Sequence, residues 1–190
     1  DWYYVDKEGK ALTGEHTING DRVYFIDHPV SFEDHRGKQV KGDFAENGRY
    51  YDQHTGALTD LGTNRYVQVN DDWYYIGSTG TILKGQQTID DVEVYFDKTT
   101  GKQVKGEFVT ESGFVNDYGI HFYDKDTGAL LKQQYFNFND SWYYADADGI
   151  ILKGAHTIDG VEVYFDKSNG KQVKGQFVTE SGYISDSGIH

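Results

Sequence analysis

An internal repeat constrains the fold of this 190-residue chain more than any other feature of its sequence. "DWYY", "DWYY" and "SWYY" place Trp2, Trp73 and Trp142 about 70 residues apart, and the stretches that start at Trp73 and Trp142 align almost without gaps. Such a period is typical of architectures in which each unit buries its apolar face against its neighbours. The sequence therefore predicts one repeat domain with long repeats over 1–71, 72–140 and 141–190, the last of them truncated.

Each long repeat divides into shorter units of roughly twenty residues. In units such as "WYYADADGIILKG", an aromatic triplet leads to an Asp/Asn/Gly turn and then to a short alternating run. This pattern predicts a hairpin that runs from the triplet through the turn into the alternating run. No apolar stripe follows a helical period. An isolated hairpin is only marginally stable in water, so the expected fold class is all-β, a β-solenoid of stacked hairpins.

The composition fits a stack held together by aromatic side chains. The chain has 16 Tyr, 11 Phe and 23 Gly, one Pro, no Met and no Cys, and its mean hydropathy is −0.71. Most of the Tyr and Phe residues are therefore expected between hairpins, with a minority in recognition. The absence of cysteine excludes both a disulfide framework and thiol catalysis.

The charge restricts the class of partner. The formal net charge is −13, which argues against nucleic acids and anionic membrane surfaces, since both are bound by basic residues. A neutral or a cationic partner remains. No stretch is long and apolar enough for a spanning helix. The chain opens at "DWYY", in the middle of a repeat, so we expect it to be a fragment of a larger protein.

Nothing in the sequence predicts catalysis, a metal or a cofactor. The acidic residues cluster in turns such as "DKTTG", where Asp bonds to its own backbone, and repeated copies give no singular acid–base pair. The loop "HPVSFEDH" could bring His28, Glu33, Asp34 and His35 to a metal, but an exposed polar loop is the preferred interpretation. The chain is therefore expected to be noncatalytic.

The phrase "GKQVKG" occurs at 37–42, 101–106 and 170–175, identical each time. Side chains alternate between the two faces of a strand, so the Gln and the Lys share one face and the Val lies on the other. Amide and ammonium groups suit a hydroxyl-rich neutral ligand, such as a sugar that stacks on a neighbouring Tyr. Two interpretations stay open: a shallow sugar pocket between hairpins, or polar residues that are merely solvated.

The motifs "WYY", "LKG", "VYFD" and "GKQVKG" resemble the glucan-binding repeats of secreted glucansucrases from lactic acid bacteria, over essentially the whole chain. Those repeats are related to choline-binding and cell-wall-binding repeats. The resemblance implies a β-solenoid in a secreted or cell-surface protein. It also implies binding of α-glucan such as dextran or isomaltooligosaccharides, and a catalytic domain that lies outside this chain.

The resemblance also implies sugar pockets made of a stacking aromatic residue and a Gln-x-Lys pair. The pairs map onto Gln39 with Lys41, Gln103 with Lys105, and Gln172 with Lys174. The expected stacking residues are Tyr4, Tyr75 and Tyr144, with Tyr3, Tyr74 and Tyr143 as the second choice; His16, Gln87 and His156 are expected to line the same pockets. An insertion within "FIDHPVSFEDHRG" precedes Gln39, so the first pocket is expected to be distorted or lost.

Two other functions use the same architecture. A choline-binding module would anchor to teichoic acid through aromatic cages, for which Trp is the best residue. The chain has three Trp and carries Gln beside the expected cage, which disfavours choline. A purely structural spacer would need no convergent polar groups, whereas the repeated Gln-x-Lys pairs favour a ligand.

Overall fold

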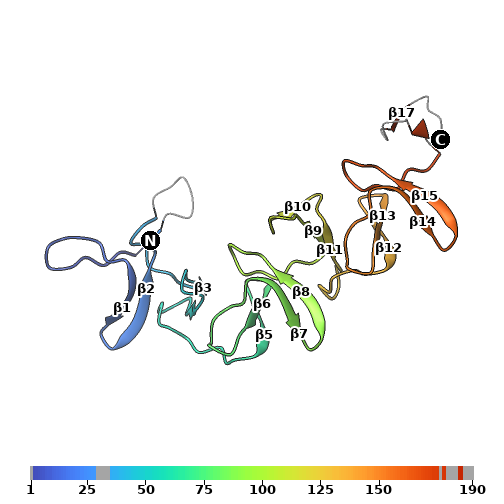
Figure 1. Cartoon of the computed structure of the whole chain (residues 1–190). Coiled ribbons are helices and arrows are strands. Elements are labelled where there is room, and N and C mark those ends of the chain that lie inside the picture. The colour runs from blue at the N-terminus through green and yellow to red at the C-terminus, as the bar shows by residue number, and fades with distance from the viewer. Residues whose placement is uncertain (1, 29–34, 176, 179–183, 186–190) are drawn as a thin grey trace. The chain divides into compact units, whose positions relative to one another are not determined.

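The computed structural model describes residues 2–28, 35–175, 177–178 and 184–185 as a succession of short antiparallel hairpins (Figure 1). By their internal contacts the residues form two compact units, Asp1–Leu83 and Lys84–His190, each described by itself below. Within the described part of the chain, no helix is long and apolar enough to cross a membrane.

Six strands of the first unit form three hairpins: β1 (Gly14–Ile18) with β2 (Asp21–Phe25), β3 (Asp43–Phe44) with β4 (Tyr50–Tyr51), and β5 (Arg65–Val69) with β6 (Asp72–Ile76). The second unit begins with β7 (Gly85–Ile89) paired to β8 (Val92–Phe96), followed by a three-stranded sheet of β9 (Glu107–Val109), β10 (Val115–Asn116) and β11 (His121–Tyr123). Its remaining pairs are β12 (Gln134–Phe138) with β13 (Ser141–Ala145), β14 (Gly154–Ile158) with β15 (Val161–Phe165), and β16 (Phe177–Val178) with β17 (Ile184–Ser185). The predicted all-β series of hairpins is confirmed.

The hairpins differ from the prediction in where they start. Each five-residue pair closes through a two-residue turn that precedes the aromatic triplet, as in Asn139–Asp140 between β12 and β13. Both turn residues have positive φ, 47° and 57°. That combination matches the right-handed twist of the strands and suits Asn, Asp and Gly. The run after the triplet, predicted to be the second strand, pairs through a single bridge from Ala145 to Ile151.

Main-chain hydrogen bonds join hairpins that follow one another within a unit. In the first unit, the Leu58 amide donates to the Arg22 carbonyl at 2.7 Å. In the second unit, the Leu130 amide donates to the Glu93 main-chain carbonyl at 2.8 Å, and the Ile151 amide donates to the Ile120 carbonyl at 2.9 Å. These bonds satisfy backbone groups that an isolated hairpin would leave to water. Successive hairpins therefore stabilise one another, as the repeat predicted.

Aromatic rings fill the spaces between hairpins. The largest cluster of the second unit consists of Phe108, Phe122, Leu131, Phe136, Tyr143, Ala145 and Ile151. In the first unit, Tyr74, Ile76 and Ile82 form an equivalent cluster. The middle residue of the aromatic triplet is buried in both, because Tyr74 is 4% exposed and Tyr143 is 3% exposed. These two tyrosines, the second choice for sugar stacking, belong to the core.

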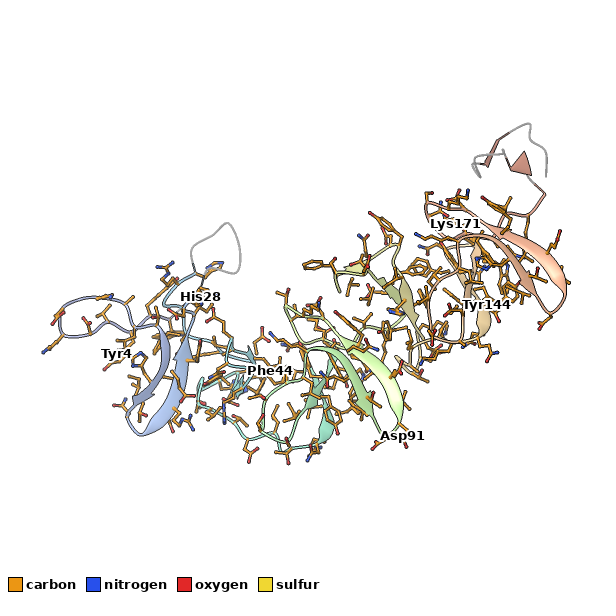
Figure 2. All side chains as sticks on the ribbon, in the orientation of Figure 1. Tyr4, His28, Phe44, Asp91, Tyr144 and Lys171 are labelled. Atoms are coloured by element: carbon orange, nitrogen blue, oxygen red, sulfur yellow. The ribbon has the colours of Figure 1, made fainter. Side chains whose placement is uncertain are left out.

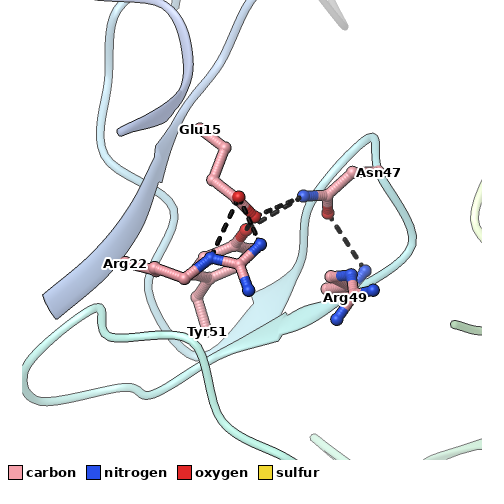
Figure 3. Close-up of polar contacts among 5 residues, drawn as sticks. All are labelled: Glu15, Arg22, Asn47, Arg49 and Tyr51. Atoms are coloured by element: carbon pink, nitrogen blue, oxygen red, sulfur yellow. Dashed lines mark hydrogen bonds and ion pairs between the residues drawn. The ribbon is translucent and has the colours of Figure 1, made fainter. Parts of the chain in front are cut away.

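A polar network also joins the first two hairpins (Figure 3). Glu15 on β1 pairs with Arg22 on β2, and its Oε2 accepts hydrogen bonds from Tyr51 Oη at 3.0 Å and Asn47 Nδ2 at 3.5 Å. The hydrogen bond from Arg22 lowers the pKa of the Glu15 carboxyl. Strand register places Gln86 and Ala155 where the first copy has Glu15, so this network is specific to the first copy.

Candidate functional site

Two aromatic residues of the third copy, one exposed and one half-buried, lie on the face of β13 that points away from the core. Trp142 and Tyr144 flank the buried Tyr143 and, by strand alternation, share the opposite face. Trp142 is 43% exposed. Tyr135 on β12 lies directly across from Tyr144, with their ring centroids 4.8 Å apart and nearly perpendicular. These rings offer a surface on which an apolar ligand face could stack.

The next hairpin supplies the floor and the polar edge of this surface. Phe165 on β15 is fully buried, and its ring centroid lies 6.5 Å from that of Tyr135 and 6.2 Å from that of His156. Gln172 forms a β-bridge with Phe165, and its main-chain N–H donates to the Trp142 carbonyl at 2.7 Å. We call this group the third-copy cluster: Tyr135, Trp142, Tyr144, His156, Phe165, Gln172 and Lys174.

The first-copy cluster is similar but includes no counterpart of Tyr135; it consists of Trp2, Tyr4, His16, Phe25, Gln39 and Lys41. The ring of Phe25 lies 6.5 Å from that of Tyr4 and 6.1 Å from that of His16. Gln39 forms a β-bridge with Phe25, and its main-chain N–H donates to the Trp2 carbonyl at 2.8 Å. Tyr4 and Tyr144 are labelled in Figure 2, each within its own unit.

The insertion in the first copy leaves the backbone register at Gln39 unchanged. Phe25 bridges to Gln39 as Phe96 does to Gln103 and Phe165 to Gln172. The residues on either side of the insertion are hydrogen-bonded to one another, because the Ile26 amide donates to the Lys38 carbonyl and the Gly37 amide donates to the Ile26 carbonyl. The expected distortion is therefore absent from the described backbone around Gln39. Residues 29–34 of the insertion lie outside the described part of the chain.

The second-copy residues fall into two different units and are described separately. Tyr75 on β6 lies across from Tyr66 on β5, with ring centroids 4.9 Å apart in an edge-on contact. Gln87, Gln103 and Lys105 belong to the second unit. Their pairing with Tyr75 stays a prediction.

The lysines of the first two Gln-x-Lys pairs each have a partner in the backbone. Lys41 Nζ donates to the His54 carbonyl and Lys105 Nζ to the Asp126 carbonyl, both at 3.1 Å. Each lysine precedes the first strand of a hairpin, and each carbonyl lies in the turn after its last strand. Lys84 and Lys153 make the same contact, to Thr99 and Ser168. The lysines thus close the base of successive hairpins, a role that neither sequence interpretation included.

The glutamine side chains contribute to the same closure. Gln39 Nε2 lies 3.5 Å from the Thr55 carbonyl, and Gln103 Nε2 lies 3.4 Å from the Thr127 carbonyl. A primary amide has two N–H donors and an oxygen that can accept two hydrogen bonds, so this contact uses one of its four positions. An ammonium has three donors, and the turn contact uses one of them. The glutamine amides therefore have further positions to which a ligand could bond.

Three further expected pocket residues form side-chain hydrogen bonds with the backbone carbonyl three residues earlier. His16 Nε2 lies 2.7 Å from the Thr13 carbonyl and His156 Nε2 lies 3.0 Å from the Lys153 carbonyl. Gln87 Nε2 donates to the Lys84 carbonyl at 2.9 Å. The three side chains share a nitrogen that can donate a hydrogen bond to this carbonyl. Their first role is to hold the segment that enters the hairpin.

Sequence reasoning missed Tyr66 and Tyr135. Each lies on the first strand of its hairpin, opposite the tyrosine that was expected to stack. The signal was the position of each tyrosine relative to the two-residue turn, since register across such a turn fixes the cross-strand partner. A hairpin that begins at the aromatic triplet, as predicted from the sequence, does not contain this cross-strand partner.

No cluster of metal-binding side chains is found among the described residues. No group of three or more His, Cys, Asp or Glu residues in that part of the chain could hold a metal ion. Glu33 and Asp34 lie outside it, and His28 Nδ1 lies 3.7 Å from a carboxylate oxygen of Glu46. In the turns, hydrogen bonds from the backbone of Thr55 and Thr127 lower the pKa of Asp52 and Asp124 respectively. These carboxylates are backbone acceptors, as the sequence predicted.

Substitution of Gly128 by alanine is expected to disturb the second Gln-x-Lys pair. Gly128 has φ of +76°, and a Cβ there would lie 2.5 Å from Gln103 Nε2. The left-handed backbone costs about 1–2 kcal/mol for alanine, and displacement of Gln103 adds to this. Gly160→Ala is the control, because its φ is +79° and nothing lies within 4 Å of its Cβ. Urea denaturation should show a larger loss for Gly128→Ala; equal losses would mean that Gln103 is not held against this turn.

Two family models match consecutive parts of the chain. The choline-binding repeat model matches residues 83–135 and 152–185. The model described as a putative cell wall binding repeat matches residues 64–82 and 134–151. Together they cover residues 64–185 without a break.

The curated relatives include two enzymes of Streptococcus mutans serotype c. Glucosyltransferase-S is 39% identical over 180 residues, and glucosyltransferase-I is 33% identical over 198 residues. The alignments cover 92% and 98% of this chain but 11% and 12% of the relatives. The chain therefore spans about a tenth of the length of the curated relatives it matches.

Solved structures show the same fold. Choline binding protein F from Streptococcus pneumoniae is 22% identical, with a TM-score of 0.50 over 96% of this chain and 60% of that chain. CbpJ from the same species is 19% identical, with a TM-score of 0.51 over 96% of this chain and 61% of that chain. The repeat models and these folds agree with the hairpin series, and the chain belongs to the choline-binding and cell-wall-binding repeat family, in a form similar to a segment of the streptococcal glucosyltransferases.

Proposed function

We propose that the chain is a noncatalytic carbohydrate-binding module for α-glucan, such as dextran or isomaltooligosaccharides. The observation that carries the proposal is the third-copy cluster, in which half-exposed Tyr144 and exposed Trp142 lie beside the polar side chains of Gln172 and Lys174. A sugar ring has an apolar face that stacks on an aromatic ring and hydroxyls that bond to amide and ammonium groups. A net charge of −13 suits a neutral polymer better than an anionic one.

The relatives suggest what such binding would serve. Two of them are named glucosyltransferases, and this chain corresponds to about a tenth of each. In the proposal, the module is part of a larger secreted or cell-surface glucansucrase and keeps the catalytic domain near its polymer. Each cluster buries little ligand area and binds weakly. Clusters in several copies raise the affinity for a polymer, because binding at one site raises the effective concentration at the next.

Affinity electrophoresis in a gel that contains dextran tests the proposal. The unaltered chain should be retarded, and Gln103→Ala with Gln172→Ala should reduce the retardation about tenfold or more, since two of the three sites lose an amide. These changes leave the net charge, and so the mobility without dextran, unchanged. The matched control replaces Gln86 and Gln134, two exposed glutamines on strands β7 and β12, and should migrate like the unaltered chain.

Two outcomes of this experiment count against the proposal. Unretarded migration of the unaltered chain, beside a known dextran binder that is held back, would contradict glucan binding. Retardation that survives the loss of Gln103 and Gln172 would contradict the location of the pockets.

A choline-binding module is the second candidate, favoured by the match of the choline-binding repeat model to residues 83–135 and 152–185. In that case the chain would be retained on a matrix that carries choline, and free choline, but not glucose oligomers, would elute it. A structural spacer would be retained neither by dextran nor by choline.

A further inference from the structure

The two Trp residues in the first- and third-copy clusters each have a lysine ammonium over the indole. Lys41 Nζ lies 5.7 Å from the ring centroid of Trp2, and Lys174 Nζ lies 5.1 Å from that of Trp142. Both distances are within the range of a cation–π contact. Both indoles are exposed, Trp2 at 70% and Trp142 at 43%, so the cation lies on a surface that a ligand could otherwise reach.

The lysine of the first copy is held in this position by a second contact. Lys41 Nζ donates to the His54 carbonyl at 3.1 Å, so the same ammonium bonds to the turn of the next hairpin and lies over Trp2. A lysine side chain in water samples many rotamers, whereas two simultaneous partners restrict it. The ammonium is therefore a fixed part of the aromatic surface.

A quaternary ammonium ligand such as choline needs the face that these lysines occupy. Choline binds through attraction between its positive charge and the electron-rich face of an aromatic ring, and Trp provides the strongest attraction. An ammonium already over that face attracts no second cation and repels one at about 5 Å. A neutral sugar meets no such repulsion and gains a hydrogen-bond donor.

We propose that Lys41 and Lys174 are specificity-determining residues: each places a built-in cation over the indole of its cluster and thereby excludes quaternary ammonium ligands such as choline. The proposal deepens the function proposed above, because it states which ligand class the same clusters reject. It also explains how a member of a choline-binding repeat family would keep exposed indoles without binding choline.

The experiment measures choline binding by equilibrium dialysis at constant ionic strength, with the whole chain in each case. In Lys41→Met with Lys174→Met, the dissociation constant for choline should fall about tenfold or more, because removal of a like charge at about 5 Å has an effect of this order. Lys41→Arg with Lys174→Arg retains the cation and should bind choline as weakly as the unaltered chain. Circular dichroism verifies that each variant is folded.

Two controls separate the local cation from other effects. Lys84→Met with Lys153→Met removes the same total charge from two lysines that donate to the turn carbonyls of Thr99 and Ser168, and should leave choline affinity within about twofold. The neutral carbon isostere of choline, dimethylbutanol, should bind the Lys41 and Lys174 double variant no better than the unaltered chain.

Three results would overturn the proposal. They are an unchanged choline affinity in the folded methionine variant, an equal gain in the Lys84 and Lys153 control, and an equal gain for dimethylbutanol. The last would show that the lysines obstruct the indoles by their size and not by their charge. Dextran retardation of the unaltered chain is measured separately, so a failure of glucan binding is distinguishable from a failure of choline exclusion.

Discussion

Replacement of Phe108 by alanine is expected to lower the free energy of unfolding of the second unit by about 3–5 kcal/mol. Phe108 on β9 is 1% exposed, and its ring contacts come from other strands and from the next hairpin. Its centroid lies 4.7 Å from that of Phe122, 5.1 Å from that of Tyr143 and 5.3 Å from that of Phe138. A cavity at this position removes contacts on both sides of a hairpin junction, where a repeat fold obtains its stability.

Chemical denaturation followed by tryptophan fluorescence measures this effect, since Trp142 lies on β13 next to the affected cluster. The matched control is Phe114→Ala, six residues along the chain in the same sheet region, whose side chain is 60% exposed. Its stability should change by less than about 1 kcal/mol. Equal denaturation midpoints for Phe108→Ala and the unaltered chain would show that this junction does not hold the unit together.

The second large effect is expected on binding rather than on stability. In the triple variant Tyr4→Ala, Tyr75→Ala and Tyr144→Ala, dextran retardation should be abolished, because every proposed pocket loses its stacking ring. The fold should persist, since Tyr75 and Tyr144 are half-buried and Tyr4 is exposed. The loss of the cross-strand contacts with Tyr66 and Tyr135 costs about 0.2–1 kcal/mol each.

Substitution of the neighbouring tyrosine, Tyr143, is expected to affect stability and not the stacking surface. Tyr143 differs from Tyr144 by one position but stacks on Phe136 at 5.3 Å in the core, so Tyr143→Ala should cost about 3–5 kcal/mol of stability. Tyr118→Ala is the control for loss of an exposed tyrosine outside the clusters, since Tyr118 is 58% exposed, and should leave retardation unchanged. If the triple variant were retarded like the unaltered chain, stacking on these tyrosines would be excluded.

The different roles of Tyr143 and Tyr144 show what could be predicted from the sequence. Alternation along a strand placed the first and third residues of the triplet on one face, and the burial of Tyr143 agrees with this. Alternation did not reveal which face was the core. The choice depends on the preceding sheet, whose Phe108 and Phe122 pack on the same side as Tyr143.

The "GKQVKG" phrase shows the same limit. Val104 is buried at 2% exposure, as alternation predicted. The contact of Lys105 with the Asp126 carbonyl spans an entire hairpin, and no local pattern indicates it. The lysine over Trp142 likewise joins residues of two hairpins, at 5.1 Å.

The sequence by itself determined the repeat, the all-β class and the residues that form turns, because these depend on period, alternation and the backbone preferences of Asn, Asp and Gly. Only the tertiary structure decided where each hairpin begins, and so which tyrosine lies across from Tyr144. It also decided that lysines close the hairpins and cover the indoles. The physical reason is that both depend on packing between hairpins, where the partners are distant in sequence and a register shift of one residue would exchange the two faces.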